Sequence, residues 1–159
     1  MIFRNGKPAS PRLLSEFHFE RGIERPLQRL KIAGLRLFVI TNQPDIARGL
    51  MDSQVLDCMN QVLMDRLSVE AVEVCPHDDR DDCRCRKPKP GMLLTIANRA
   101  GIDLAESFVV GDSWRDVQAA RAAGCAGIIL ERSYNCDDDA DYRVVTLSDA
   151  AQLILGTLT

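Results

Sequence analysis

Three cysteines and one histidine fall within eleven residues, in the segment CPHDDRDDCRC. Cys75, His77, Cys83 and Cys85 follow the spacing C-x-H-x5-C-x-C, and a Cys₃His set matches tetrahedral structural zinc in ligand type and number. The spacing differs from the C-x2-C pairs of zinc fingers, so the pattern alone leaves open a metal site or a reduced cysteine-rich loop that binds nothing. Four protein ligands would leave no open position on the metal, so its expected role is structural.

Residues suited to an anionic, oxygen-rich ligand occur on both sides of this segment. Thr41, Asn42 and Gln43 come directly after the apolar run LRLFVI and offer a hydroxyl group and two amides. Lys87 follows the cysteine segment and precedes a predicted helix, whose N-terminal amides would add positive potential. Taken singly, Thr41 is equally compatible with a strand end and Lys87 with an exposed lysine.

Two carboxylates follow another apolar run, SFVV, in the segment GDSWRD. Asp112 and Asp116 are four residues apart, so both are expected to project from the first turn of the next helix on one side. Carboxylates beside an anion site make chemical sense when a hard cation such as Mg²⁺ lies between them and a phosphate. The simpler alternative is that Asp112 is the N-cap of that helix.

The elements that must position these residues alternate between helix and strand. Apolar periodicity predicts helices over residues 21–34, 52–67, 91–101, 113–124 and 148–155. Short apolar runs predict strands over residues 35–40, 69–74, 107–110, 126–130 and 142–147, the first of them covered on both faces. This order predicts an α/β fold: an open, doubly wound, mostly parallel sheet with helices on both faces. Ligands bind such sheets beyond the carboxyl ends of the strands.

A threonine after one strand, a lysine before a helix and GDxxxD after another strand resemble the second, third and fourth motifs of the haloacid dehalogenase (HAD) superfamily. Within it, the chain is similar to the branch of D-glycero-D-manno-heptose-1,7-bisphosphate phosphatases and histidinol-phosphate phosphatases. The segments that carry the resemblance are VITNQPDIARG, CPH…CRCRKPKPGML and VVGDSWRDVQAARAAG. The resemblance implies a Rossmann-like HAD core with a zinc-binding loop.

The resemblance also implies roles for the residues that match its motifs. Thr41, with Asn42 and Gln43 beside it, would hold the transferring phosphoryl group. Lys87 would neutralise the charge on that group, and Arg86 would recognise the substrate.

Two metals are implied as well. Asp112 would be a ligand of catalytic Mg²⁺, and Asp116 would support it without touching the metal. The Cys₃His set would hold structural Zn²⁺. Because the loop is rich in aspartate and almost free of apolar residues, it cannot fold by burial, and the metal would fix it and so position Arg86 and Lys87.

One part of the family pattern is missing. Phosphatases of this superfamily use an aspartate nucleophile in a DxDG motif after the first, central strand, and the 159 residues contain no DxDG. The opening MIFRNGKPAS is similar to the run that follows DxDG in family members. Either that motif and that strand lie ahead of Met1, or the protein is a non-catalytic, phosphate-binding relic. The 159 residues are therefore expected to be poorly stable and inactive unless the chain is extended at its N-terminus.

The function expected from these residues is Mg²⁺-dependent hydrolysis of a small sugar phosphate, D-glycero-D-manno-heptose 1,7-bisphosphate, at its 7-phosphate. Histidinol phosphate, a nucleic-acid 3′-phosphate and a non-catalytic phosphate-binding role are the alternatives. Against nucleic acid stand the lack of a basic stripe and the small number of stacking side chains, one Trp and two Tyr.

Composition supports an ordinary globular protein. With 159 residues, 46% of them hydrophobic, and a net charge of −3, we expect a single domain over residues 1–159. We see no bilayer-length apolar run and no signal peptide, so we expect a cytoplasmic monomer that binds neither nucleic acid nor membranes. Cys58 and Cys125 are expected to be small core residues, and Cys136 a loop thiol.

Overall fold

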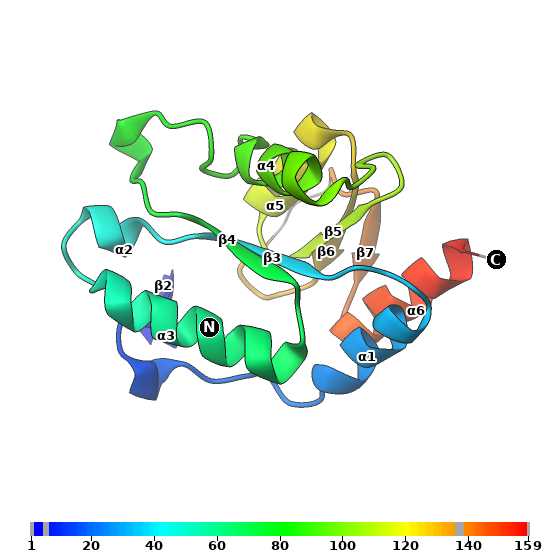
Figure 1. The fold of residues 1–159 in the computed structure, drawn as a ribbon, viewed down its shortest axis with the longest axis horizontal. Coiled ribbons are helices and arrows are strands. Elements are labelled where there is room, and N and C mark those ends of the chain that lie inside the picture. Colours follow the sequence, from blue (N-terminus) through cyan, green and yellow to red (C-terminus); the bar gives the residue numbers. More distant parts are fainter. Residues whose placement is uncertain (1, 5–6, 136–138, 159) are drawn as a thin grey trace.

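The computed structural model describes residues 2–4, 7–135 and 139–158 (Figure 1). Two short strands that were not predicted, β1 (Ile2–Arg4) and β2 (Lys7–Ala9), form an antiparallel pair. A 3₁₀ turn, η1 (Leu14–Glu16), follows them and leads to the first long helix.

The helices begin and end largely where capping residues predicted. Helix α1 (Glu24–Ile32) stops just before Gly34, whose φ of +90° suits glycine. Helix α3 (Ser53–Leu67) begins at Asp52, whose carboxylate accepts a hydrogen bond from the Gln54 amide at 2.7 Å. The remaining helices are α2 (Pro44–Ala47), which was not predicted, α4 (Gly91–Ala100), α5 (Trp114–Ala123) and α6 (Leu147–Thr157).

The parallel strands form two separate sheets in the described part of the chain. Strand β3 (Phe38–Asn42) pairs with β4 (Ala71–Cys75), and β5 (Phe108–Gly111) pairs with β6 (Ala126–Leu130), which pairs with β7 (Tyr142–Val144). Helices α4 and α5 lie on one side of the strands and α1, α3 and α6 on the other (Figure 1). The predicted α/β fold with parallel strands and helices on both faces is confirmed.

A cavity of about 520 Å³ lies between the two parallel sheets. Its apolar lining includes Phe38 and Ile40 of β3 together with Phe108 and Val110 of β5. Because β3 borders this cavity, its side chains are only partly buried, and the prediction that both of its faces are covered is wrong. Within the described residues, no strand lies between β3 and β5.

The largest apolar cluster joins the first and last long helices. Leu30 of α1 packs with Ile128 of β6 and with three buried residues of α6, Ala150, Ala151 and Ile154. Figure 1 shows α1 and α6 side by side. This cluster anchors both ends of the fold, and the carboxyl ends of the strands remain available for polar residues.

The cysteines outside the Cys₃His set differ in environment. Cys125 is buried beside Val109 and Ala120, as predicted. The prediction for Cys58 is wrong: it is exposed, because Leu56 and Met59 occupy the buried face of α3. Cys136 lies outside the described residues.

No helix in the described ranges has both the length and the apolar character required to cross a bilayer.

Candidate phosphate site and candidate zinc centre

The parallel pairing of β3 and β4 brings the two candidate sites together. Thr41 is paired with Val74 and Asn42 with Cys75, so the segment after β3 and the cysteine loop after β4 leave the sheet at the same edge. The Gln43 amide continues the pairing by donating to the Cys75 carbonyl at 2.8 Å. Strand β3 ends two residues later than predicted, which places Thr41 inside the strand.

Lys87 is built into this edge rather than exposed. The Asn42 side chain donates to the Lys87 carbonyl and accepts from the Lys87 amide, both at 3.1 Å. The ammonium group of Lys87 donates to the Ile40 carbonyl at 3.1 Å and to Asp116 at 2.6 Å, and its side chain is 12% exposed. Burying an ammonium group is costly unless it is paired, so these contacts hold a positive charge at a defined position.

Asp116 is held by the first turn of α5 and by a close approach to Gly111. Its second carboxylate oxygen accepts from the Ser113 amide at 3.1 Å, completing a capping box with the Ser113 side chain. A β-carbon on Gly111 would lie 2.4 Å from Asp116 side-chain atoms. Only glycine therefore allows the carboxylate to reach Lys87.

Asp112 lies before α5 and faces a different loop. The Tyr134 hydroxyl donates to its carboxylate at 2.5 Å, and the Asn135 side chain donates to its carbonyl at 2.9 Å. Burial and the bond to Asp112 raise the pKa of Tyr134, so the phenol keeps its proton. The prediction that Asp112 and Asp116 project together from one helical turn is wrong, because Ser113 is the N-cap and Asp112 precedes it.

Gln43 contributes an unsatisfied acceptor beside Thr41. Its amide nitrogen donates to the Thr41 hydroxyl oxygen at 3.0 Å. Its amide oxygen is buried and has no hydrogen-bond partner among the described residues. A buried acceptor of this kind is costly, so a ligand that donates a hydrogen bond to it would be favoured.

The Cys₃His set is assembled. The ligand atoms of Cys75, His77, Cys83 and Cys85 all lie within 4.8 Å of one another. The Cys85 sulfur lies 3.0 Å from that of Cys75, 3.4 Å from that of Cys83 and 3.2 Å from His77 Nδ1. A tetrahedral zinc ion with bonds of about 2.3 Å separates two sulfur ligands by about 3.8 Å, so the set fits zinc after a small expansion.

The thiols of this set differ in pKa. Burial raises the pKa of Cys85 to about 12, aided by Cys75 and Cys83. For Cys83, burial acts in the same direction, but hydrogen bonds from Cys85 and the Arg86 backbone outweigh it and lower the pKa to about 7. Zinc binds thiolates, so loading this site would release protons from the cluster.

Arg86 is fixed by the zinc loop itself. Its guanidinium group donates to the Asp79 carboxylate at 2.6 Å and to the carbonyl of His77 at 3.2 Å, and its side chain is 12% exposed. The start of α4 also approaches the loop closely: a β-carbon on Gly91 would lie 2.2 Å from the Arg84 carbonyl oxygen. Sequence reasoning missed Asp79 and Gly91 as determinants of this arrangement.

Asp45, which the sequence analysis did not select, is a buried carboxylate in α2, two residues after Gln43. Asp45 accepts from Arg12 at 2.6 Å and pairs with Arg48 at 3.4 Å, and Arg48 also pairs with Asp78 of the zinc loop at 2.7 Å. Burial acts to raise the pKa of Asp45, but its bonds to Arg12 and Arg48 outweigh burial and lower it.

This lowered pKa gives a testable pH dependence. A depressed carboxylate pKa contributes stability above the unfolded value of 3.8, and the contribution is lost as the pH falls through the folded value. We expect Asp45→Asn to lower the free energy of unfolding by about 1–3 kcal/mol at pH 7 and to flatten its fall below pH 4. Urea unfolding between about pH 7 and pH 3 measures both effects. Asp57→Asn, at an exposed position of α3, is the control, and an equally steep acid slope in both variants would contradict the assignment.

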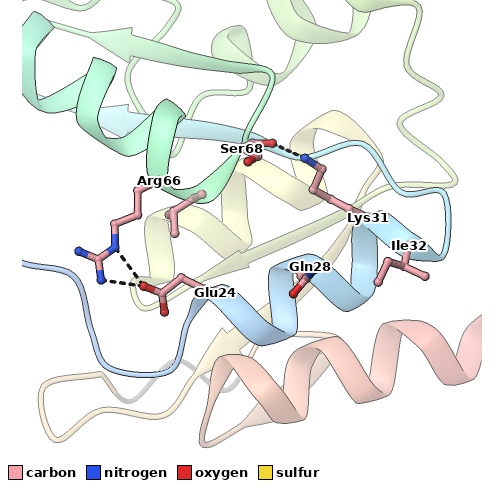
Figure 2. A pocket seen from close by; sticks show the side chains of 7 residues that line it. Glu24, Gln28, Lys31, Ile32, Arg66 and Ser68 are labelled. Atoms are coloured by element: carbon pink, nitrogen blue, oxygen red, sulfur yellow. Dashed lines mark hydrogen bonds and ion pairs between the residues drawn. The ribbon is translucent and has the colours of Figure 1, made fainter.

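A second cavity, of about 420 Å³, lies away from these residues, between α1 and the end of α3 (Figure 2). Figure 2 shows the ion pair from Glu24 to Arg66 and the hydrogen bond from Lys31 to the Ser68 carbonyl. Both helices lead from here to the amino ends of β3 and β4, the ends opposite Thr41 and Cys75. None of the predicted site residues lines this cavity.

Comparison with known proteins places the fold among the HAD-like hydrolases. Residues 84–150 match a family model described as HAD-hyrolase-like. The crystal structure of the D,D-heptose 1.7-bisphosphate phosphatase from B. bronchiseptica, complexed with magnesium and phosphate, matches with a TM-score of 0.79 and 33% identity. The match covers 92% of this chain and 88% of that one.

Sequence relatives narrow the class. A D-glycero-beta-D-manno-heptose-1,7-bisphosphate 7-phosphatase of Pseudomonas aeruginosa is 43% identical over 110 residues, which span 66% of this chain but only 62% of the relative. One from Escherichia coli strain K12 is 35% identical over 158 residues, spanning 89% of this chain and 83% of the relative. The chain belongs to this family of heptose-bisphosphate phosphatases, and the predicted resemblance is confirmed.

Proposed function

We propose that this protein is a Mg²⁺-dependent phosphomonoesterase that acts on the 7-phosphate of D-glycero-β-D-manno-heptose 1,7-bisphosphate. The observation that carries the proposal is the buried ammonium group of Lys87, held by Asp116 and tied to the end of β3 beside Thr41. Phosphoryl transfer depends mainly on positioning and on positive charge against the phosphoryl oxygens. We take the proposed substrate from the names of the similar proteins, which are heptose-1,7-bisphosphate 7-phosphatases.

The residues around Lys87 fit the remaining roles. Thr41 offers a hydroxyl group to the phosphoryl oxygens, and Arg86, the residue before Lys87, adds a second cation on the zinc loop. The unsatisfied oxygen of Gln43 suits a substrate that carries hydroxyl donors, as a sugar does.

Asp112 fits a magnesium ligand. Mg²⁺ in phosphoryl-transfer sites takes one or two carboxylates together with substrate phosphate oxygens, and Asp112 supplies a carboxylate at the carboxyl end of β5. When bound, the ion would neutralise charge on the phosphoryl oxygens. Tyr134 and Asn135 would keep Asp112 oriented, and Asp116 would act through Lys87 rather than on the metal.

The nucleophile is the remaining requirement. The 159 residues contain no DxDG, and we infer that hydrolysis needs an aspartate delivered into the cavity between β3 and β5. Lys87 and Asp116 line that cavity, so a carboxylate arriving there would meet the phosphate site. The positive charge held at Lys87 also suits a second candidate function, phosphate binding without turnover.

Phosphate binding by the 159 residues tests the site independently of turnover. We expect Lys87→Ala to weaken the binding of inorganic phosphate by about 10- to 100-fold, because a charged hydrogen-bond donor is removed. Phosphorus NMR titration measures the affinity. Lys89→Ala is the matched control, since Lys89 is an exposed cation of the same segment that pairs with Asp82.

The outcomes are distinct. Wild-type protein that binds no phosphate would overturn the site, and equal affinities in wild type and Lys87→Ala would remove Lys87 from it. In an extended chain that hydrolyses phosphate esters, a preference for histidinol phosphate over heptose bisphosphate would overturn the proposed substrate.

A further inference from the structure

One arginine joins the segment beside the phosphate site to the zinc loop. Arg48 follows α2, five residues after Gln43, and its guanidinium group donates to both carboxylate oxygens of Asp78, at 2.7 and 2.8 Å. The same group lies 3.4 Å from the buried carboxylate of Asp45. Arg48 therefore bridges the carboxylate of Asp45 in α2 and the carboxylate of Asp78 in the zinc loop.

One end of this bridge adjoins the Cys₃His set, and the other lies in α2, two residues after Gln43. Asp78 directly follows the ligand His77, and its carboxylate accepts the Asp79 amide at 2.7 Å at the start of η2 (Asp79–Asp81). Asp45 lies in α2, and its carbonyl accepts from the amides of Leu50 and Met51, which close the segment that begins at Gln43.

We propose that Arg48 is a positioning residue that couples zinc binding at the Cys₃His set to phosphate binding at Thr41 and Lys87. The proposal rests on the phosphate site proposed above. Zinc fixes His77 and therefore Asp78, and the bidentate pair transfers that order to Arg48 and to α2. Without zinc, the loop has too few apolar residues to stay ordered, and Arg48 loses one of its two carboxylates.

Coupling of this kind must act in both directions. If zinc strengthens phosphate binding, phosphate strengthens zinc binding by the same factor. Arg86 and Lys87 follow the loop in the chain and contribute to this coupling through the backbone. The structure assigns the part of the coupling that side chains carry to Arg48. Replacing Arg48 should therefore lower the coupling factor, while zinc and phosphate can each still bind.

The experiment measures zinc affinity of the zinc-loaded protein by equilibrium competition with a chromophoric chelator, with and without saturating inorganic phosphate. We expect phosphate to raise zinc affinity at least about fivefold in the wild type. In Arg48→Gln we expect the factor to fall below about twofold. Lys89→Gln is the matched control: it breaks the ion pair with Asp82 inside the loop segment and should keep the wild-type factor.

Two further variants guard against unfolding. Arg48→Lys keeps the charge but loses the bidentate fork, so it should also lose most of the coupling while retaining the wild-type circular dichroism spectrum. Asp78→Asn should match Arg48→Gln, and the double variant should add nothing further.

The failures can be told apart. A wild-type protein that binds phosphate, as seen by phosphorus NMR, with a coupling factor of one would overturn only the role of Arg48. The wild-type factor in both Arg48→Gln and Arg48→Lys would do the same. Absence of phosphate binding in zinc-loaded wild type would overturn the proposed function, and this proposal with it.

Discussion

Replacing Cys83 or Cys85 by serine is expected to abolish zinc binding and to disorder residues 76–87. Protein purified without chelator should contain about one zinc ion per chain, and either variant close to none, because three remaining ligands hold a structural ion far less tightly. Elemental analysis measures the metal, and amide hydrogen exchange measures the order of the loop.

The physical reason lies in the composition of the loop. Its aspartates, Asp78, Asp79, Asp81 and Asp82, cannot be stabilised by burial, and the ion pair between Asp82 and Lys89 is exposed and therefore weak. Cys58→Ser, at an exposed position of α3, is the control and should retain zinc. A metal-free wild type with an ordered loop would rule out the zinc centre.

Adding an apolar strand that ends in DxDG ahead of residue 1 is expected to produce both a more stable protein and phosphatase activity. The cavity between β3 and β5 is lined by apolar side chains of both strands, and each apolar side chain newly buried there contributes about 1.5–3 kcal/mol before the cost of ordering the chain. Thermal unfolding should shift upward by several degrees.

The control for this prediction separates structure from chemistry. An otherwise identical extension ending in NxDG should keep the gain in melting temperature and lose at least about 10³-fold in turnover, because the nucleophile is removed. Hydrolysis of heptose bisphosphate by the 159 residues at the rate of the extended form would contradict our inference about the nucleophile. An extension that leaves the melting temperature unchanged would show that no strand enters the cavity.

Features formed by residues close together in the sequence could be predicted from it. The four residues of the Cys₃His set lie within eleven residues, so their spacing marked a candidate set, which the family resemblance then assigned to zinc. The helix signals at Gly34 and Asp52 act over a single turn and were therefore visible in the sequence. The alternation of elements fixed the fold class because each apolar run has its own period. The exact bounds of β3 were missed because the pairing with β4, rather than the apolar run, sets where the ladder ends.

Side-chain partners far apart in sequence could not be predicted. Arg12 and Asp45 are 33 residues apart, and Tyr134 and Asp112 are 22 apart. No local pattern connects these pairs, and only the packing of the elements brings them together. The exposure of Cys58 was missed for a related reason, since a thiol fits either face of a helix and its neighbours on α3 decide which face is buried.

The packing of α1 against α6 means that this part of the core can form only when synthesis is nearly complete. Leu30 leaves the ribosome long before Ile154, and at about 5–20 residues per second the interval between them is roughly 6–25 s. During that time the apolar face of α1 lacks its native partners and is open to chaperones or to aggregation. The zinc ligands, by contrast, are synthesised within eleven residues of one another, so the metal loop can close while the main core is still incomplete.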